Sequence, residues 1–308
     1  MTEIKKVALL GAGAVGAYFI PGLMRTLGDD FCVVAEGRRA ERLRTEGLVI
    51  NDKLYIPTVK TPQEARGADL LLIAAKYDGL KEAFPDIKTI VADNTIVIST
   101  MNGIDSEELL AEVIGEEHIL YGFMFIASER TGNHIRFNYE KTRGLVFGEK
   151  NSGADSSERE KAVASLLDSA GIRCRISKEI VREQWQKYIL NVGNNLPQAI
   201  LGVGYGAYCD SAHVLALHDR LFEEVTEVAK AYGVSLHYVV DEKGAFPDAA
   251  RFSTLQDLDA GRHTEVEMFA GVLIKKAKEK GISVPFAEFA YHALKALEEK
   301  NDGLFDYT

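Results

Sequence analysis

The residues that most clearly point to a chemistry are the glycines of the string GAGAVG, at Gly11, Gly13 and Gly16. An apolar stretch, residues 7–10, precedes the string, and apolar residues at helical spacing follow it. A strand that leads into a glycine-rich turn and then a helix is typical of dinucleotide binding, because backbone amides can then approach a pyrophosphate. The predicted coenzyme contacts are Gly11, Gly13, Ala14, Val15 and Gly16. The alternative is a glycine turn in an ordinary α/β domain.

An acidic residue follows at the place where such units usually bind the coenzyme ribose. The second apolar stretch, residues 31–35, ends at Glu36, 20 residues after Gly16. We therefore expect the Glu36 carboxylate to lie beside the ribose of a bound dinucleotide.

Two polar residues follow the next predicted strands. Lys76 comes after residues 70–75, and Asn102 comes after residues 95–100. Parallel strands end at one edge of a sheet, where ligands collect. A lysine there can meet a phosphate or a carboxylate, and an asparagine can hold a nicotinamide or a carbonyl oxygen. The alternatives are a solvated lysine and an Asn-Gly turn.

A lysine and several amides share one face of a predicted helix in the second half. Lys187 and Asn191 are four residues apart, and the face continues to Gln184 and Asn195. Residues 188–190 beside them are apolar, so this face lies near a buried boundary. A lysine removed from water has a lowered pKa and can donate a proton near neutral pH. The alternative is a lysine that extends its charged end to solvent.

The segment RFSTLQDLDAGRHTEVE, residues 251–267, holds further candidates. Ser253 precedes a short helical pattern and can cap that helix or bind a ligand. Thr264 and Glu265 lead into an apolar helix. Because acidic residues are favoured at helix starts, Glu265 has a structural explanation beside a functional one.

The elements that must position these residues divide the chain in two. Continuous apolar runs alternate with helices in the first half, as in a parallel sheet covered on both faces. We expect a Rossmann-type α/β domain over residues 1–177, in which short strands between 118 and 148 extend the sheet. A helix is also expected near residues 79–84. Residues 178–308 should form an all-α domain, with helices over 178–199, 213–232, 265–280 and 286–300, and a ligand should bind between the domains.

Composition excludes several classes of function. The 308 residues carry a net charge of −10, which argues against nucleic acid and anionic membranes as partners. Three widely spaced cysteines, Cys32, Cys174 and Cys209, indicate reduced thiols in the cytoplasm, and the first strand leaves no room for a signal peptide. No histidine or cysteine pair has the spacing of metal ligands, so we expect no metal site.

In order along the chain, these motifs resemble the ketopantoate reductase (2-dehydropantoate 2-reductase) family over nearly the full length. The matching pieces are GAGAVG, Lys76, the Asn-Gly turn at residue 102, WQKYILN, FSTLQDL and GRHTEVEMFAGVLIKKAKEKGISVP. The resemblance implies a C-terminal domain like that of 6-phosphogluconate dehydrogenase, and often a homodimer. It also implies a cytoplasmic enzyme that reduces 2-dehydropantoate to D-pantoate with NADPH, in pantothenate and coenzyme A synthesis.

The resemblance also implies roles for the candidate residues. Lys187 would be the catalytic proton donor, and Glu265 would bind the substrate hydroxyl near it. The implied substrate contacts are Asn191, Asn195, Ser253 and Asn102. Lys76 and Asn102 would lie at the nicotinamide side of the coenzyme.

Three departures from the family pattern keep alternatives open. Glu36 stands where relatives commonly have an arginine for the 2′-phosphate of NADPH, so NADH is possible, although Arg38 and Arg39 follow closely. Asp105 replaces a frequent glycine, and Pro197 lies one place later than in some relatives, which leaves another branched or hydroxylated 2-oxo acid as a possible substrate. A non-catalytic nucleotide sensor is a third reading, against which the presence of Lys187 argues.

Overall fold

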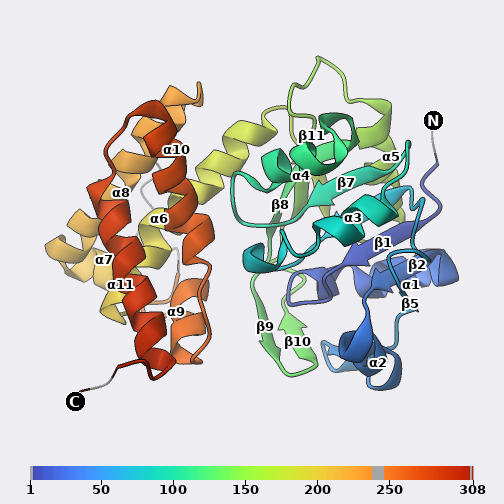
Figure 1. The fold of residues 1–308 in the computed structure, drawn as a ribbon, viewed down its shortest axis with the longest axis horizontal. Coiled ribbons are helices and arrows are strands. Elements are labelled where there is room, and N and C mark those ends of the chain that lie inside the picture. Colours follow the sequence, from blue (N-terminus) through green and yellow to red (C-terminus); the bar gives the residue numbers. More distant parts are fainter. Residues whose placement is uncertain (1–2, 238–245, 306, 308) are drawn as a thin grey trace. The chain divides into compact units, whose positions relative to one another are not determined.

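The chain forms two compact units, Met1–Ile180 and Val181–Thr308, in a computed structural model that describes residues 3–237, 246–305 and 307 (Figure 1). The first unit is α/β and the second is helical in its described residues. The fold class expected from the sequence is therefore confirmed. The division falls between Ile180 and Val181, three residues after the boundary at residue 177 that the sequence predicts.

The first unit is built on an eight-stranded sheet in the order β12-β11-β8-β7-β6-β1-β2-β5. Its strands are β1 (Val7–Leu10), β2 (Phe31–Val34), β5 (Val59–Lys60), β6 (Leu70–Ile73), β7 (Ile96–Ser99), β8 (Ile119–Phe125), β11 (Gly144–Gly148) and β12 (Cys174–Ile176). All neighbours are parallel except β8 and β11. Every residue of β1, β2 and β6 is buried, which explains their continuous apolar sequences.

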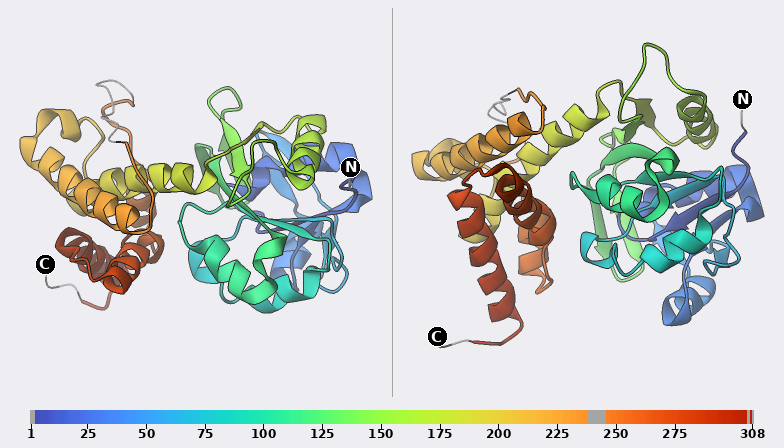
Figure 2. Two further views of the ribbon diagram at one scale, coloured as in Figure 1. Left: turned by 90° about the horizontal axis from the view of Figure 1, so that it is seen from above. Right: turned by 45° about the horizontal axis from the view of Figure 1, so that its top comes forward.

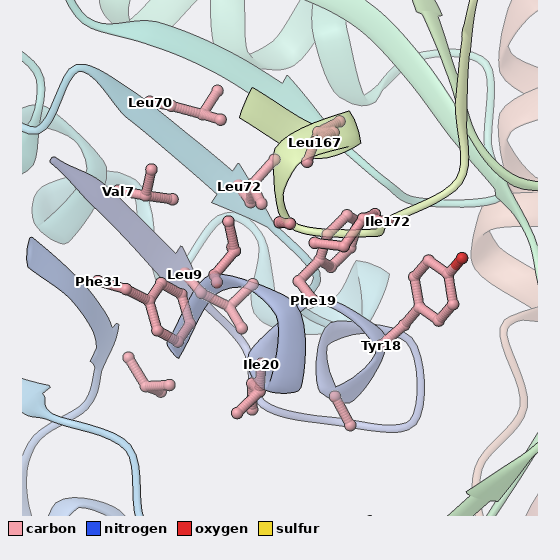
Figure 3. Packing of buried hydrophobic residues seen from close by; sticks show 14 of the residues in the cluster. Val7, Leu9, Tyr18, Phe19, Ile20, Phe31, Leu70, Leu72, Leu167 and Ile172 are labelled. Atoms are coloured by element: carbon pink, nitrogen blue, oxygen red, sulfur yellow. The ribbon is translucent and has the colours of Figure 1, made fainter. Parts of the chain in front are cut away.

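Helices cover both faces of this sheet. They are α1 (Ile20–Leu27), α2 (Gly37–Thr45), α3 (Phe84–Ile90), α4 (Ser106–Ile114) and α5 (Glu158–Ser169). Helices α3 and α4 pack together on one face, and α1 and α5 pack together on the other (Figure 2). Figure 3 shows the core under α1, where Leu9 and Leu72 of neighbouring strands lie near Phe19, Ile20 and Ile172. This packing holds the glycine-rich turn at the end of β1.

One of the strands expected to extend the main sheet, within residues 133–139, belongs instead to a second sheet, so that prediction was wrong for it. The second sheet has the order β4-β3-β10-β9, with β3 (Leu48–Ile50), β4 (Lys53–Tyr55), β9 (Ser128–Thr131) and β10 (His134–Phe137). Strand β10 is buried only at alternate residues, as suits a sheet with one face in the core. It pairs with β3, where Ile135 lies opposite Ile50 and both side chains are buried.

The second unit contains α6 (Ile180–Leu201), α7 (Ala207–Asp210), α8 (Ala212–Ala231), α9 (Ser253–Asp259), α10 (Val272–Lys280) and α11 (Pro285–Asn301). Helix α8 packs against both α10 and α11. Gly281, in the left-handed conformation, ends α10, and Pro285 begins α11, as the sequence predicts. In the described ranges, no helix combines the length and the apolar character needed to cross a membrane.

Two predicted helices differ from the structure. The helix expected over residues 79–84 is a 3-10 turn, Tyr77–Gly79, and α3 begins only at Phe84, because Pro85 suits the first turn of a helix. The helix expected over residues 265–280 begins at Val266 and passes through a π-helical turn, Glu267–Gly271, before α10. Such π turns often occur at functional sites.

Candidate functional site

The turn after β1 needs glycine at two positions. Gly11 has a φ of +104°, and a Cβ added to it would lie 2.6 Å from the backbone of Ala74. A Cβ on Gly16 would lie 1.9 Å from the carbonyl oxygen of Gly11. Any side chain at either position would therefore break the turn. Ala14 and Val15 lie between these two glycines in the sequence.

Gly13 differs, because the packing of the described residues does not require it. A Cβ there would meet one atom within 4 Å, Nη1 of Arg130 at 3.8 Å. Open space over a glycine backbone is what a pyrophosphate needs to approach the amides of such a turn. The GAGAVG string thus contains two glycines that shape the turn and one that leaves room beside it.

The candidate coenzyme residues after β2 are exposed. Glu36 lies directly before α2 in extended conformation, and Arg38 and Arg39 stand in the first turn of this helix. The expected ribose-binding carboxylate and the two arginines are therefore all accessible at the carboxyl end of β2.

The carboxyl ends of β1, β6 and β7 lie side by side. Ile73 pairs with both Leu10 and Ser99, so the segments that carry Gly11, Lys76 and Asn102 leave the same edge of the sheet. Lys76 is exposed and Asn102 is partly buried.

Asp105, which stands where the family pattern often has a glycine, links two of these segments. The Tyr77 hydroxyl donates a hydrogen bond to Oδ2 of Asp105 at 2.6 Å, which ties the segment after β6 to the segment after β7. Asp105 is itself buried.

The second unit brings Lys187 and Glu265 within electrostatic range of each other. Lys187 is partly buried on α6, and Glu265 stands just before the helical turn that begins at Val266. Burial lowers the pKa of Lys187 to about 7, while the negative charge of Glu265 acts in the opposite direction and raises it. An ammonium group with this pKa can release a proton at neutral pH.

Hydrogen bonds on both sides hold Glu265 in place. The backbone N–H and the hydroxyl of Thr264 both donate to Oε1 of Glu298, at 2.7 and 2.6 Å, and Lys295 donates to Oε2 at 2.8 Å. On the other side, the Tyr188 hydroxyl donates to the carbonyl oxygen of Phe269 in the π-helical turn. Because Tyr188 is next to Lys187, α6 both carries the lysine and anchors the segment after Glu265.

Three of the four expected substrate contacts, Asn191, Asn195 and Ser253, lie in this unit, whereas Asn102 lies in the first unit. Asn195 donates from Nδ2 to Oγ of Ser253 at 3.4 Å. The Nδ2 atom of Asn191 is buried and has no hydrogen-bond partner among the described residues. Buried amide groups normally have partners, because an unmade hydrogen bond costs about 1–3 kcal/mol.

Sequence reasoning missed the residue that positions Ser253. Gln198 donates to the carbonyl oxygen of Ala250 at 3.0 Å and accepts from the N–H of Phe252 at 2.6 Å. Its signal in the sequence was only that it lies on the amide-rich helix, three residues after Asn195.

Other features of the described residues lie apart from this chemistry. No group of three or more histidine, cysteine or acidic side chains is placed to hold a metal ion in the ranges that the structure covers. A cavity of about 140 Å³ is lined by Tyr18, Arg25 and Tyr139 among others, and by none of the predicted site residues.

Known proteins match the chain along almost its whole length. The family model described as ketopantoate reductase PanE/ApbA matches residues 7–152, and the model of its C-terminal part matches residues 179–298. The 2-dehydropantoate 2-reductase of Aquifex aeolicus is 26% identical over 307 residues, which cover 96% of this chain and 97% of that protein. The 2-dehydropantoate 2-reductase of Archaeoglobus fulgidus is 29% identical over 288 residues, which cover 91% of this chain and 93% of that protein.

Solved structures agree with these matches. A PanE/ApbA family ketopantoate reductase from Ralstonia eutropha JMP134 has a TM-score of 0.82 at 26% identity, covering 96% of this chain and 99% of that one. A D-mandelate dehydrogenase solved with NADH and anilino(oxo)acetate has a TM-score of 0.83 at 21% identity, with the same coverage, which is a likeness of fold alone. Since the two family models together match most of the sequence, this chain belongs to the ketopantoate reductase PanE/ApbA family of oxidoreductases.

Proposed function

We propose that this protein reduces 2-dehydropantoate to D-pantoate with a reduced nicotinamide coenzyme. The observation that carries the proposal is Lys187, a partly buried lysine beside Glu265 whose pKa burial lowers to about 7. Reduction of a ketone places negative charge on its oxygen, and a fixed ammonium group stabilises that charge more in the transition state than in the ground state.

In the proposed reaction, the coenzyme supplies a hydride to the carbonyl carbon. The carbonyl π electrons move to the oxygen, and Lys187 donates a proton to that oxygen, which gives the alcohol and a neutral amine. The amine then takes a proton from solvent. Because the pKa of Lys187 is about 7, both the donation and the return of the proton are possible at neutral pH.

Glu265 and the amide side chains orient the substrate in this proposal. The Glu265 carboxylate accepts a hydrogen bond from the substrate hydroxyl. Its negative charge raises the pKa of Lys187, so that a fraction of the Lys187 side chains stays protonated. Asn191 supports the proposal independently, since its buried Nδ2 gains a partner when a substrate oxygen reaches it. Asn195, Ser253 and Asn102 are the remaining proposed contacts.

NADPH is the coenzyme we propose, as in the family pattern, and NADH is the second candidate. The exposed Glu36 favours NADH, because a carboxylate pairs with ribose hydroxyls and repels a 2′-phosphate. Arg38 and Arg39 on the first turn of α2 favour NADPH, because guanidinium groups bind phosphate with two hydrogen bonds. The proposed coenzyme contacts otherwise remain the glycine string and Lys76.

The deciding experiment follows the absorbance of the reduced nicotinamide with 2-dehydropantoate, in parallel with NADPH and NADH. Rapid oxidation of either coenzyme supports the reaction, and the ratio of kcat/KM values gives the preference. Binding of coenzyme without oxidation would reject 2-dehydropantoate and lead to a panel of branched and hydroxylated 2-oxo acids. That alternative is favoured by Asp105 and Pro197. Failure with every oxo acid would favour the nucleotide sensor.

We further propose a cytoplasmic homodimer formed by the helical unit. Helix α11 exposes Phe286 and Phe289, which lie three residues apart and so on one face. The proposal predicts a dimer mass in sedimentation equilibrium, and a monomer at all concentrations would reject it.

A further inference from the structure

An arginine far from the GAGAVG string in sequence lies beside it in the structure. Nη1 of Arg130, on β9, is 3.8 Å from the place that a Cβ on Gly13 would occupy. The Nε of the same side chain donates to the carbonyl oxygen of Gly132 at 2.9 Å, which holds the guanidinium group against its own hairpin turn. Of the nitrogens in this guanidinium group, only Nη1 lies within 4 Å of that place.

The second sheet explains how this arginine reaches the glycine turn. Arg130 pairs with Ile135 of β10, and Ile135 pairs with Ile50 of β3. Strand β3 follows α2 after a short connection, and α2 begins directly after Glu36. The β9–β10 hairpin therefore lies in the neighbourhood of α2 (Figure 1), and its Arg130 lies near Gly13.

Two further arginines act on Arg130. Arg130 is exposed on β9, but the partial removal of its guanidinium group from water is the larger influence that lowers its pKa, and the positive charges of Arg42 and Arg39 lower it further. Arg39 and Arg42 are three residues apart on α2, so they share one face of that helix. Like charges held near each other repel, and a bound anion relieves that repulsion.

We propose that Arg130, together with Arg39 and Arg42, binds a phosphate group of the coenzyme. This inference rests on the proposed use of a nicotinamide coenzyme and adds to it a phosphate-binding residue from the second sheet. Three guanidinium groups offer paired N–H donors of the kind that phosphate accepts. The phosphate can be the pyrophosphate, which lies over Gly13 in such turns, or the 2′-phosphate of NADPH, which lies beyond β2. In the second case the arginines offset the repulsion from Glu36.

Calorimetric titration of the full-length protein with nucleotide fragments tests the proposal. The ligands are 2′,5′-ADP, which carries the 2′-phosphate, and 5′-ADP, which carries the pyrophosphate. Arg130→Ala should weaken the binding of one or both fragments by about tenfold or more, since charge-assisted hydrogen bonds have that strength. A loss confined to 2′,5′-ADP assigns the 2′-phosphate, and a loss with 5′-ADP assigns the pyrophosphate. Arg130→Lys should keep part of the affinity because it keeps the charge.

Arg136→Ala is the matched control. Arg136 lies on the neighbouring strand β10 and pairs with Asp52 at 2.6 Å, with most of its side chain exposed. This variant should bind both fragments as the wild type does. If Arg130→Ala also binds both as the wild type does, with an unchanged melting temperature, the proposal is overturned while the proposed function stands. If the wild type binds neither fragment nor either coenzyme, the proposed function fails and this inference fails with it.

Discussion

The dependence of the rate on pH tests the proposed proton donor most directly. Burial lowers the pKa of Lys187 to about 7, from 10.5 for an unperturbed lysine. At that pKa, about half of the Lys187 side chains carry their proton at pH 7 and about a tenth at pH 8. We therefore expect kcat/KM for ketone reduction to fall about tenfold per pH unit above pH 7. A lysine with an ordinary pKa would keep the rate level to about pH 9.

The assay is the oxidation of reduced coenzyme at constant ionic strength between pH 6 and pH 9, with two variants as controls. Glu265→Gln removes the charge that raises the pKa of Lys187, so the fall in rate should begin at lower pH. Lys187→Ala should lower kcat by about 100-fold or more, and its residual rate should not follow the same curve. Coenzyme affinity, followed by the fluorescence of Trp185, should stay nearly unchanged.

Either of two results would refute the reasoning. A level wild-type profile from pH 6 to pH 9 would mean that no group with the pKa of Lys187 carries the proton. An unaltered kcat in Lys187→Ala would remove this residue from the reaction, whatever the profile. If kcat/KM falls over the same pH range in the wild type and in Glu265→Gln, the charge of Glu265 does not raise the pKa of Lys187. Lys187 would then remain the proton donor, but without Glu265 as its proposed partner.

The remaining predictions concern the coenzyme and the support of Glu265. Glu36→Arg should raise the ratio of kcat/KM for NADPH over NADH by about tenfold or more, and an unchanged ratio would show that Glu36 does not meet the ribose. Gly13→Ala should leave the melting temperature unchanged but weaken coenzyme binding, whereas Gly16→Ala should lower the melting temperature too, because its Cβ would lie 1.9 Å from the Gly11 carbonyl oxygen. Equal stability of the two variants would contradict that geometry. Glu298→Gln should lower the free energy of unfolding in urea by about 1–3 kcal/mol, because it weakens a buried acceptor of three hydrogen bonds, and a stability equal to the wild type would argue against the role of Glu298.

The main sheet could be predicted from the sequence because its signals are local. Strands β1, β2 and β6 are buried on both faces, so each appears as an unbroken apolar run. The pairing of β10 with β3 has no such signal, because residues 134–135 and 49–50 are far apart in the chain and β10 alternates between buried and exposed positions. Arg130 was missed for the same reason, since only this pairing brings it to Gly13.

The site shows the same division between local and distant signals. The helical spacing of Lys187 and Asn191 is visible in the sequence, and both lie on α6. The π-helical turn after Glu265 is not visible, because its residues have the pattern of an ordinary α-helix. Nor does any local pattern show that Gln198 holds the segment before Ser253, because that contact joins residues more than 50 positions apart.

The contacts around Lys187 explain how a lysine in a poorly solvated place can keep a defined position. Removing an ammonium group from water favours any rearrangement that returns it to solvent. Here the neighbouring Tyr188 fixes α6 to the π-helical turn, and Glu298 fixes Thr264 just before Glu265. None of these hydrogen bonds involves a ligand, so the segments that carry Lys187 and Glu265 are held without substrate, as the proposed electrostatic stabilisation of a transition state requires. The two carboxylates should therefore behave differently when neutralised. Glu298→Gln weakens the support and should lower stability, whereas Glu265→Gln alters the field at Lys187 and should shift the pH profile.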